Sequence, residues 1–193
     1  MASDLNEIKT CYIDRIVSFL DGSSERVVNN KEFVRIYQII VNQCDSEDNN
    51  EPLYDFYQEQ CDRYIQTKLI PKIRGKTGAI MINEYVKCWK NFAIFSKCCH
   101  RMLDYLDRYF LKNNNLPLLG ENSLTKFKDQ VHDQHAQAIL SAVLQQISND
   151  RDGNQIELEN LKITLQSYVE MGLEKPKIMK TPDGFVWQGD KNL

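Results

Sequence analysis

The sequence is poor in residues that interrupt helices, and it lacks long apolar runs. Only five prolines and eight glycines occur among its 193 residues, and they fall between segments of helical periodicity. No stretch alternates apolar and polar residues over the length of a strand. No apolar run approaches the roughly 20 residues that a membrane helix needs. These absences predict an all-α protein with no membrane partner.

Neither sign of charge dominates, because 24 basic and 27 acidic side chains give a formal net charge of -3. This balance offers no general reason to bind nucleic acid. Hydrophobic residues at 42% and aromatic residues at 10% suffice for the core of one mid-sized domain. The first segment, MASDLNEIKTCYIDR, is too polar for a secretory signal. We expect a cytoplasmic and nuclear protein in a reducing compartment.

The six cysteines form no CxxC pair. Cys98 and Cys99 are adjacent, so on a helix they point about 100° apart and are badly placed for one tetrahedral ion. In a reducing compartment, small buried apolar residues are the expected role of such cysteines. We therefore predict neither a disulfide framework nor a bound cofactor.

Apolar residues spaced three and four apart predict a series of helices. Asn30 and Asn50 are the expected N-caps of the second and third, and Pro71 is expected to end the third. The pattern predicts seven or so helices in total and leaves open whether the fourth divides near 91–96. The tail, 174–193, is expected to be poorly ordered. The predicted helices cover about 4–20, 31–44, 50–69, 80–113, 123–149 and 156–172.

Two short motifs have weak matches to ligand-binding loops. GKTG at 75–78 resembles the end of a phosphate-binding loop, but Ile70 stands where the first glycine belongs and a helix precedes it. SNDRDGNQIELE at 148–159 partly fits a calcium loop, although its first position is Ser148 instead of aspartate. His132 and His135 are spaced like metal ligands on a helix, with no completing cluster. Calcium or metal binding through 148–159 or His132/His135 is thus the alternative hypothesis.

Catalysis has no positive support in the sequence. A nucleophilic Cys98 or Cys99 would need His100 in a geometry that adjacency along the chain does not provide. No glycine-rich elbow precedes a serine, and no carboxylate pair stands out. We predict a protein that is not an enzyme.

Interaction with another protein remains as the positive hypothesis. The segment FVRIYQIIVNQC at 33–44 spreads apolar groups over too wide an arc for a simple surface helix. Aromatic residues clustered at the start of a helix are common interface anchors. The same pattern also suits a helix buried on two sides by its own bundle, and composition does not separate the two.

Several segments, taken in order, resemble the N-terminal region of cullins, the scaffolds of multi-subunit ubiquitin ligases. The similarity covers about residues 10–173, and the last segment is most like the cullins that work with F-box proteins. The resemblance implies a five-helix cullin repeat over 1–120 and a partial second repeat over 121–173. The segments are FVRIYQIIVNQC, LYDFYQEQCDRYI at 53–65, YVKCWKNFAIFSKCCHRMLDYLDRYFLKNNN at 85–115, LTKFKDQV at 124–131, DRDG at 150–153 and LQSYVEMGL at 165–173.

In cullins the second and fifth helices of the first repeat dock a BTB-fold adaptor. The resemblance thus implies a non-catalytic scaffold that binds a Skp-type adaptor and, through it, F-box-type substrate receptors. Contacts are expected from the second helix and from the exposed side of 97–109, taken as the fifth helix. The implied residues are Phe33, Val34, Ile36, Tyr37, Val41, Lys97, Arg101, Tyr105 and Tyr109.

Nothing after Gly172 resembles the family's C-terminal region, which holds the RING protein and the lysine that receives the ubiquitin-like modifier. The expectation is a fragment or a naturally short homologue that sequesters adaptors. A helical protein that keeps the fold without binding an adaptor is a further possibility, which Phe33, Val34 and Tyr37 argue against. A partial repeat exposes its inner face, so it must pack back on the first bundle or leave an apolar surface that favours self-association.

Overall fold

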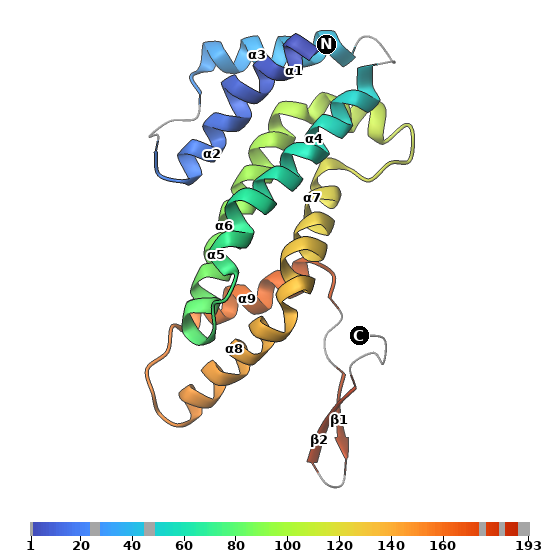
Figure 1. Ribbon diagram of the computed structural model, residues 1–193. Helices are drawn as coiled ribbons and strands as arrows, with labels where there is room; N and C mark the ends of the chain where they lie inside the picture. The colour runs from blue at the N-terminus through green and yellow to red at the C-terminus, as the bar shows by residue number, and fades with distance from the viewer. Residues whose placement is uncertain (1, 24–27, 45–48, 174–176, 182–183, 189–193) are drawn as a thin grey trace.

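The computed structural model of the chain is an elongated stack of antiparallel helices (Figure 1). It describes residues 2–23, 28–44, 49–173, 177–181 and 184–188, with side chains described as far as Leu173. In this part of the chain the helical segments join into six continuous helices, which confirms the all-α prediction. They are α1 (Ala2–Ile8), η1 (Lys9–Ile13) and α2 (Asp14–Leu20); α3 (Asn30–Cys44); α4 (Asn50–Tyr64), η3 (Ile65–Leu69) and α5 (Ile70–Ile73); α6 (Gly78–Leu106) and η4 (Asp107–Leu111); α7 (Leu119–Phe127), η5 (Lys128–His132) and α8 (Asp133–Arg151); and α9 (Leu158–Glu170).

The long helix α6 is the central element, and α4 and α5 run alongside it (Figure 1). Its predicted stripe of apolar residues faces the core from Tyr85 to Leu106. Tyr64 of α4 stacks on Phe95 of α6 with ring centres 4.5 Å apart. Trp89 of α6 meets Phe127 of α7 edge to face at 5.1 Å. Burying these large rings removes apolar area from water and so stabilises the stack.

Helix α6 is undivided through 91–96, so this stretch counts as one helix and not two. In the described part of the chain, four continuous helices precede residue 119, and the fifth is α7–η5–α8. The expectation of five helices before residue 120, with 97–109 as the fifth, is therefore wrong. The segment 97–109 belongs to the fourth helix, because the apolar stripe of α6 stays in register through 91–96.

Pro71 does not end the third helix as expected. The preceding turn, η3, is a π-helix, in which the Ile70 N–H donates to the Ile65 carbonyl five residues back. This wider turn accommodates the proline ring that would otherwise strain the helix. The chain thus remains helical to Ile73.

Two predicted caps are displaced by one residue. Helix α3 is capped by Asn29, whose Oδ1 accepts the Glu32 N–H at 3.0 Å, while the Glu32 carboxylate accepts the Asn29 N–H at 2.9 Å. Helix α4 begins at Asn50, with Asn49 as its N-cap residue. Asparagines stand in adjacent pairs at both sites, so propensity alone does not choose between them.

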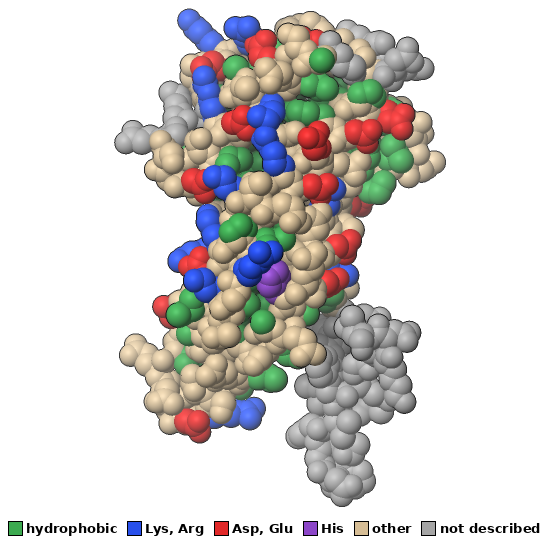
Figure 2. All heavy atoms as spheres, viewed as in Figure 1, with side chains coloured by type: hydrophobic (Ala, Val, Ile, Leu, Met, Phe, Trp, Pro, Cys, Tyr) green, Lys and Arg blue, Asp and Glu red, His purple; other side chains and the backbone are tan. Residues whose placement is uncertain are grey.

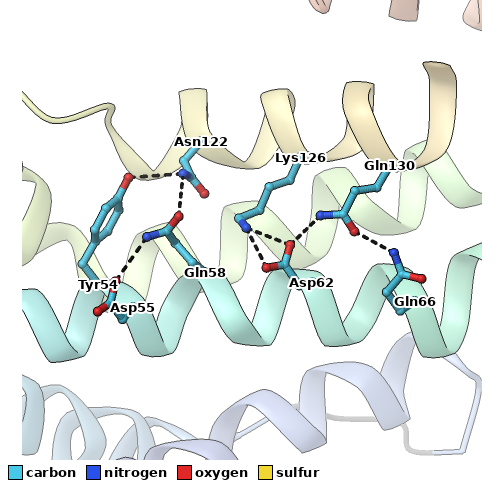
Figure 3. Close-up of polar contacts among 8 residues, drawn as sticks. All are labelled: Tyr54, Asp55, Gln58, Asp62, Gln66, Asn122, Lys126 and Gln130. Atoms are coloured by element: carbon cyan, nitrogen blue, oxygen red, sulfur yellow. Dashed lines mark hydrogen bonds and ion pairs between the residues drawn. The ribbon is translucent and has the colours of Figure 1, made fainter. Parts of the chain in front are cut away.

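A polar row joins the third helix to the fifth (Figure 3). The Asp62 carboxylate accepts hydrogen bonds from Lys126 Nζ at 2.7 and 2.8 Å and from Gln130 Nε2 at 2.6 Å. Nearer the start of α7, Asn122 Nδ2 donates to the Tyr54 hydroxyl at 3.2 Å. These contacts align α7 and η5 along α4.

Helix α9 packs on α6 and leaves its other side uncovered. Thr164 and Ser167 are fully buried, and the Ser167 hydroxyl lies 3.0 Å from the hydroxyl of Tyr85. The opposite side exposes Leu158, Leu165 and Val169. Both outcomes expected for a partial repeat are thus present: the helix packs back and an apolar face remains.

Where we expected a poorly ordered tail, the structure has a hairpin. Strand β1 (Lys177–Thr181) pairs antiparallel with β2 (Gly184–Gln188), with Thr181 opposite Gly184. Strand formers such as Ile178 and Val186 favour this pairing, which a search for longer alternating runs does not detect. The sequence also allows Phe185 and Trp187 of the tail to dock elsewhere on the protein, an expectation that lies outside the described side chains.

Candidate functional site

The expected contact residues of the second helix divide between a buried face and an exposed edge. Ile36 is only 1% exposed and lies in the core with Ile40, so its predicted role as a partner contact is corrected to that of an anchor. Val34 is 61% exposed, and Phe33, Tyr37 and Val41 are half-buried. Helix α3 is thus fixed by one face while its aromatic edge stays accessible.

The structure brings this edge against the second half of α6. The guanidinium carbon of Arg101 lies 4.9 Å from the centre of the Phe33 ring, which is cation–π geometry. Phe33 also stacks near-parallel with Tyr37 at 6.4 Å. One turn beyond Arg101, the rings of Tyr105 and Tyr109 pack 4.4 Å apart. Residues 68 positions apart in the sequence, Phe33 and Arg101, therefore belong to one surface.

We call this the α3/α6 surface. It consists of the aromatic edge of α3 and the accessible side of α6 and η4, and Lys97 stands exposed one turn before Arg101. Its members are Phe33, Val34, Tyr37, Val41, Lys97, Arg101, Tyr105 and Tyr109.

Buried contacts behind the α3/α6 surface hold it rigid. The Tyr12 hydroxyl donates to the Cys98 carbonyl at 2.9 Å, which ties η1 to α6. Burial, reinforced by the nearby Cys98 and Cys99 thiols, raises the pKa of Tyr12 above its usual range, so the hydroxyl remains a donor. The Tyr12 ring also meets Phe33 edge to face at 6.2 Å. The aromatic edge is therefore presented in one orientation, which lowers the entropy lost on binding.

Sequence reasoning did not identify the exposed apolar residues of the loop between η4 and α7. Leu116 and Leu118 are partly exposed there, at the same end of the stack as α3 (Figure 1). The Tyr54 hydroxyl donates to the Pro117 carbonyl at 3.3 Å and holds the loop against α4. The run of asparagines before Leu116 indicated only a turn, so no sequence pattern marked these leucines as surface residues.

Charges on the visible face of the molecule are mixed. Figure 2 shows Lys and Arg side chains interspersed with Asp and Glu, with several Lys and Arg side chains above α3 at the top left. Among the described residues no helix is long and apolar enough to cross a membrane.

The alternative metal sites gain no support from the structure. Within the described ranges, no group of three or more His, Cys, Asp and Glu side chains is arranged to hold an ion. His132 is buried against the ring of Tyr168 at 4.7 Å, whereas His135 Nδ1 lies 2.9 Å from the Val131 carbonyl of its own helix. The segment 148–159 consists of the last turn of α8, the connection at 152–157 and the start of α9.

The adjacent cysteines and the GKTG segment have packing and turn roles in the structure. Cys99 is buried, and burial raises its thiol pKa, which opposes formation of a nucleophilic thiolate. The imidazole of His100 instead lies 3.0 Å from the Asp107 carboxylate. GKTG connects α5 to α6, and Gly75 and Gly78 adopt positive φ in that turn.

Comparison with known proteins gives one consistent family. The cullin alpha solenoid domain matches residues 12–185. Cullin-1 of Oryza sativa subsp. japonica is 33% identical over 164 residues, covering 83% of this chain and 22% of the relative. Cullin-like protein 3 of Arabidopsis thaliana is 29% identical over 159 residues, covering 82% of this chain and 62% of the relative. The chain thus spans less than two thirds of these relatives.

Proposed function

The chain belongs to the cullin family, and on that premise we propose that it is a scaffold module that binds a BTB-fold adaptor of the Skp type through the α3/α6 surface. Through the adaptor it would hold F-box-type substrate receptors in a ubiquitin ligase complex, in the cytoplasm and nucleus. Its role is to position proteins, with no catalytic step of its own.

The accessible aromatic edge of α3 is the observation that supports this proposal. Had Phe33 and Tyr37 been enclosed in their own bundle, no partner would reach them. Instead both rings are half-buried and stack on each other beside Arg101. Aromatic rings and arginine next to an exposed aliphatic residue have the composition of an interface hot spot.

Burial of the α3/α6 surface supplies the binding free energy. Each Å² of apolar area removed from water contributes roughly 25 cal/mol, before the costs of association are subtracted. Val34 and Tyr109, at 61% and 57% exposure, have the most area left to bury. The rigid support from Ile36 and Tyr12 reduces the ordering cost that would offset this gain.

We propose that the loop end of α7 extends the same surface. In cullins the fifth helix contributes to adaptor docking, and the fifth continuous helix here begins at Leu119. Tyr109, Leu116 and Leu118 are exposed next to that start. An adaptor seated on Phe33 and Tyr109 would therefore have these leucines available as additional apolar contacts.

Replacement of both aromatic anchors tests the proposal. The double variant Phe33→Ala/Tyr37→Ala should lose capture of a purified Skp-type adaptor while its helical circular dichroism is unchanged. A matched control is Leu165→Ala/Val169→Ala, which removes exposed apolar side chains from α9 and should leave capture intact. Undiminished capture by the Phe33/Tyr37 variant would reject the α3/α6 surface as the docking site.

A further inference from the structure

Three carboxylates close to the α3/α6 surface are paired with cations of the chain. Glu7 lies 2.8 Å from the guanidinium of Arg35, and Glu32 lies 2.8 Å from that of Arg15. On α6, Asp104 pairs with Arg108 one turn later. Each of these acidic groups is neutralised locally.

Three cations around the same surface have no such partner among the described residues. Lys31, Lys97 and Arg101 are exposed and form no ion pair with any carboxylate in the described part of the chain. Lys31 stands one turn before Val34 on α3, and Lys97 stands one turn before Arg101 on α6. Both helices of the α3/α6 surface, α3 and α6, thus carry positive charge that no described carboxylate neutralises.

Arg101 contacts an aromatic ring and forms no ion pair with the described carboxylates, so its N–H groups are available to a carboxylate of a partner. Its guanidinium lies over the face of Phe33, which restricts the side chain without using its N–H groups. A guanidinium presents five donors in a planar fork that matches the two oxygens of a carboxylate. Because the ring contact already restricts the Arg101 side chain, less rotamer entropy is lost when a carboxylate binds.

We infer that the partner face covering the α3/α6 surface is acidic, with carboxylates opposite Lys97 and Arg101 on one side and opposite Lys31 on the other. This inference rests on the proposed function and specifies the chemistry of its partner. The apolar centre supplies affinity, and the unpaired cations accelerate encounter with a negatively charged protein and fix its orientation.

Association kinetics of a purified Skp-type adaptor test the inference. The variant Lys97→Glu/Arg101→Glu should lower the association rate constant about tenfold at low ionic strength. The wild-type rate constant should fall steeply from about 50 to about 500 mM salt, whereas that of the variant should stay nearly flat. The control Lys162→Glu reverses an exposed charge on α9 and should change the rate constant less than about twofold.

Two milder variants keep the test decisive if the double reversal perturbs folding. Lys97→Glu alone alters an exposed side chain and should give a few-fold loss. Arg101→Lys keeps the charge but not the fork, so it should retain the salt dependence and dissociate faster.

A wild-type association rate constant that does not change with salt, or charge reversals without effect on it, would overturn the inference of an acidic partner. If Phe33→Ala/Tyr37→Ala still abolished capture in that case, the docking proposal would stand. No adaptor binding by the wild type would reject both.

Discussion

The Asp107 carboxylate accepts the backbone N–H of Leu119 at 2.9 Å, across the loop between η4 and α7. The hydroxyl of Tyr57 donates to the carbonyl of Leu119 at 2.8 Å. Buried side chains of two other helices therefore hold both backbone groups of Leu119. These two hydrogen bonds form a joint that holds the start of α7 against the end of α6 and the middle of α4.

Loss of the Asp107 acceptor should destabilise the joint. Asp107→Ala leaves the buried Leu119 N–H without a partner, which costs about 1–3 kcal/mol in the free energy of unfolding. Desolvation raises the pKa of Asp107, because burial disfavours the charged form more than the Leu119 N–H and His100 favour it. Asp107→Asn keeps an accepting oxygen without the charge and should cost less. Urea unfolding and hydrogen exchange of the Leu119 amide measure both effects, and equal losses would contradict this account.

Neighbouring apolar residues of α3 should respond differently to truncation. Ile36→Ala creates a cavity in the core and should lower the free energy of unfolding by about 2–5 kcal/mol. Val34→Ala removes an exposed side chain and should change it by no more than about 0.5 kcal/mol. Denaturant titration of the two variants checks the difference. Similar losses would mean that α3 does not pack as described.

Stability should decrease as the pH falls through the range of His132. Burial lowers the pKa of this imidazole in the folded protein, whereas the unfolded value is about 6.5. Below that pH the unfolded chain binds a proton that the folded chain does not, so the free energy of unfolding falls by up to about 1.4 kcal/mol per pH unit. The stability that depends on a neutral His132 is fully present above the unfolded pKa.

His132→Gln isolates this effect. The slope of unfolding free energy against pH between about 5 and 6.5 should flatten in this variant and persist in the control His135→Gln, which alters a half-buried residue of the same helix. An unchanged slope in His132→Gln would assign the pH dependence to other groups.

Thiol reactivity should divide the cysteines into two groups. Cys11 and Cys98 are half-buried, whereas Cys44, Cys61, Cys88 and Cys99 are buried. Burial also raises the thiol pKa of Cys61 to about 12, so its reactive thiolate is scarce at neutral pH. Titration of the native protein with a thiol reagent should detect Cys11 and Cys98 first, and denaturation should release the other four. Rapid reaction of all six in the native state would contradict the packing.

The sequence by itself determined the class of the fold, the placement of most helices and the family. Apolar residues at spacings of three and four define a helical stripe whatever the neighbours are, so the stripe from Tyr85 to Leu106 was predictable. The order of the matching segments likewise identified the cullin resemblance. Residue types alone also marked Phe33 and Tyr37 as anchor candidates.

Only the tertiary structure decided which faces of these helices are covered. The family resemblance implied that Ile36 and Tyr109 both contact a partner, yet Ile36 is buried and Tyr109 is exposed. The cover comes from residues distant in the chain, as in the contact between Tyr12 and Cys98, 86 positions apart. A local pattern reports the apolar character of a face, but burial depends on what packs against that face, and this is settled only when all the helices assemble.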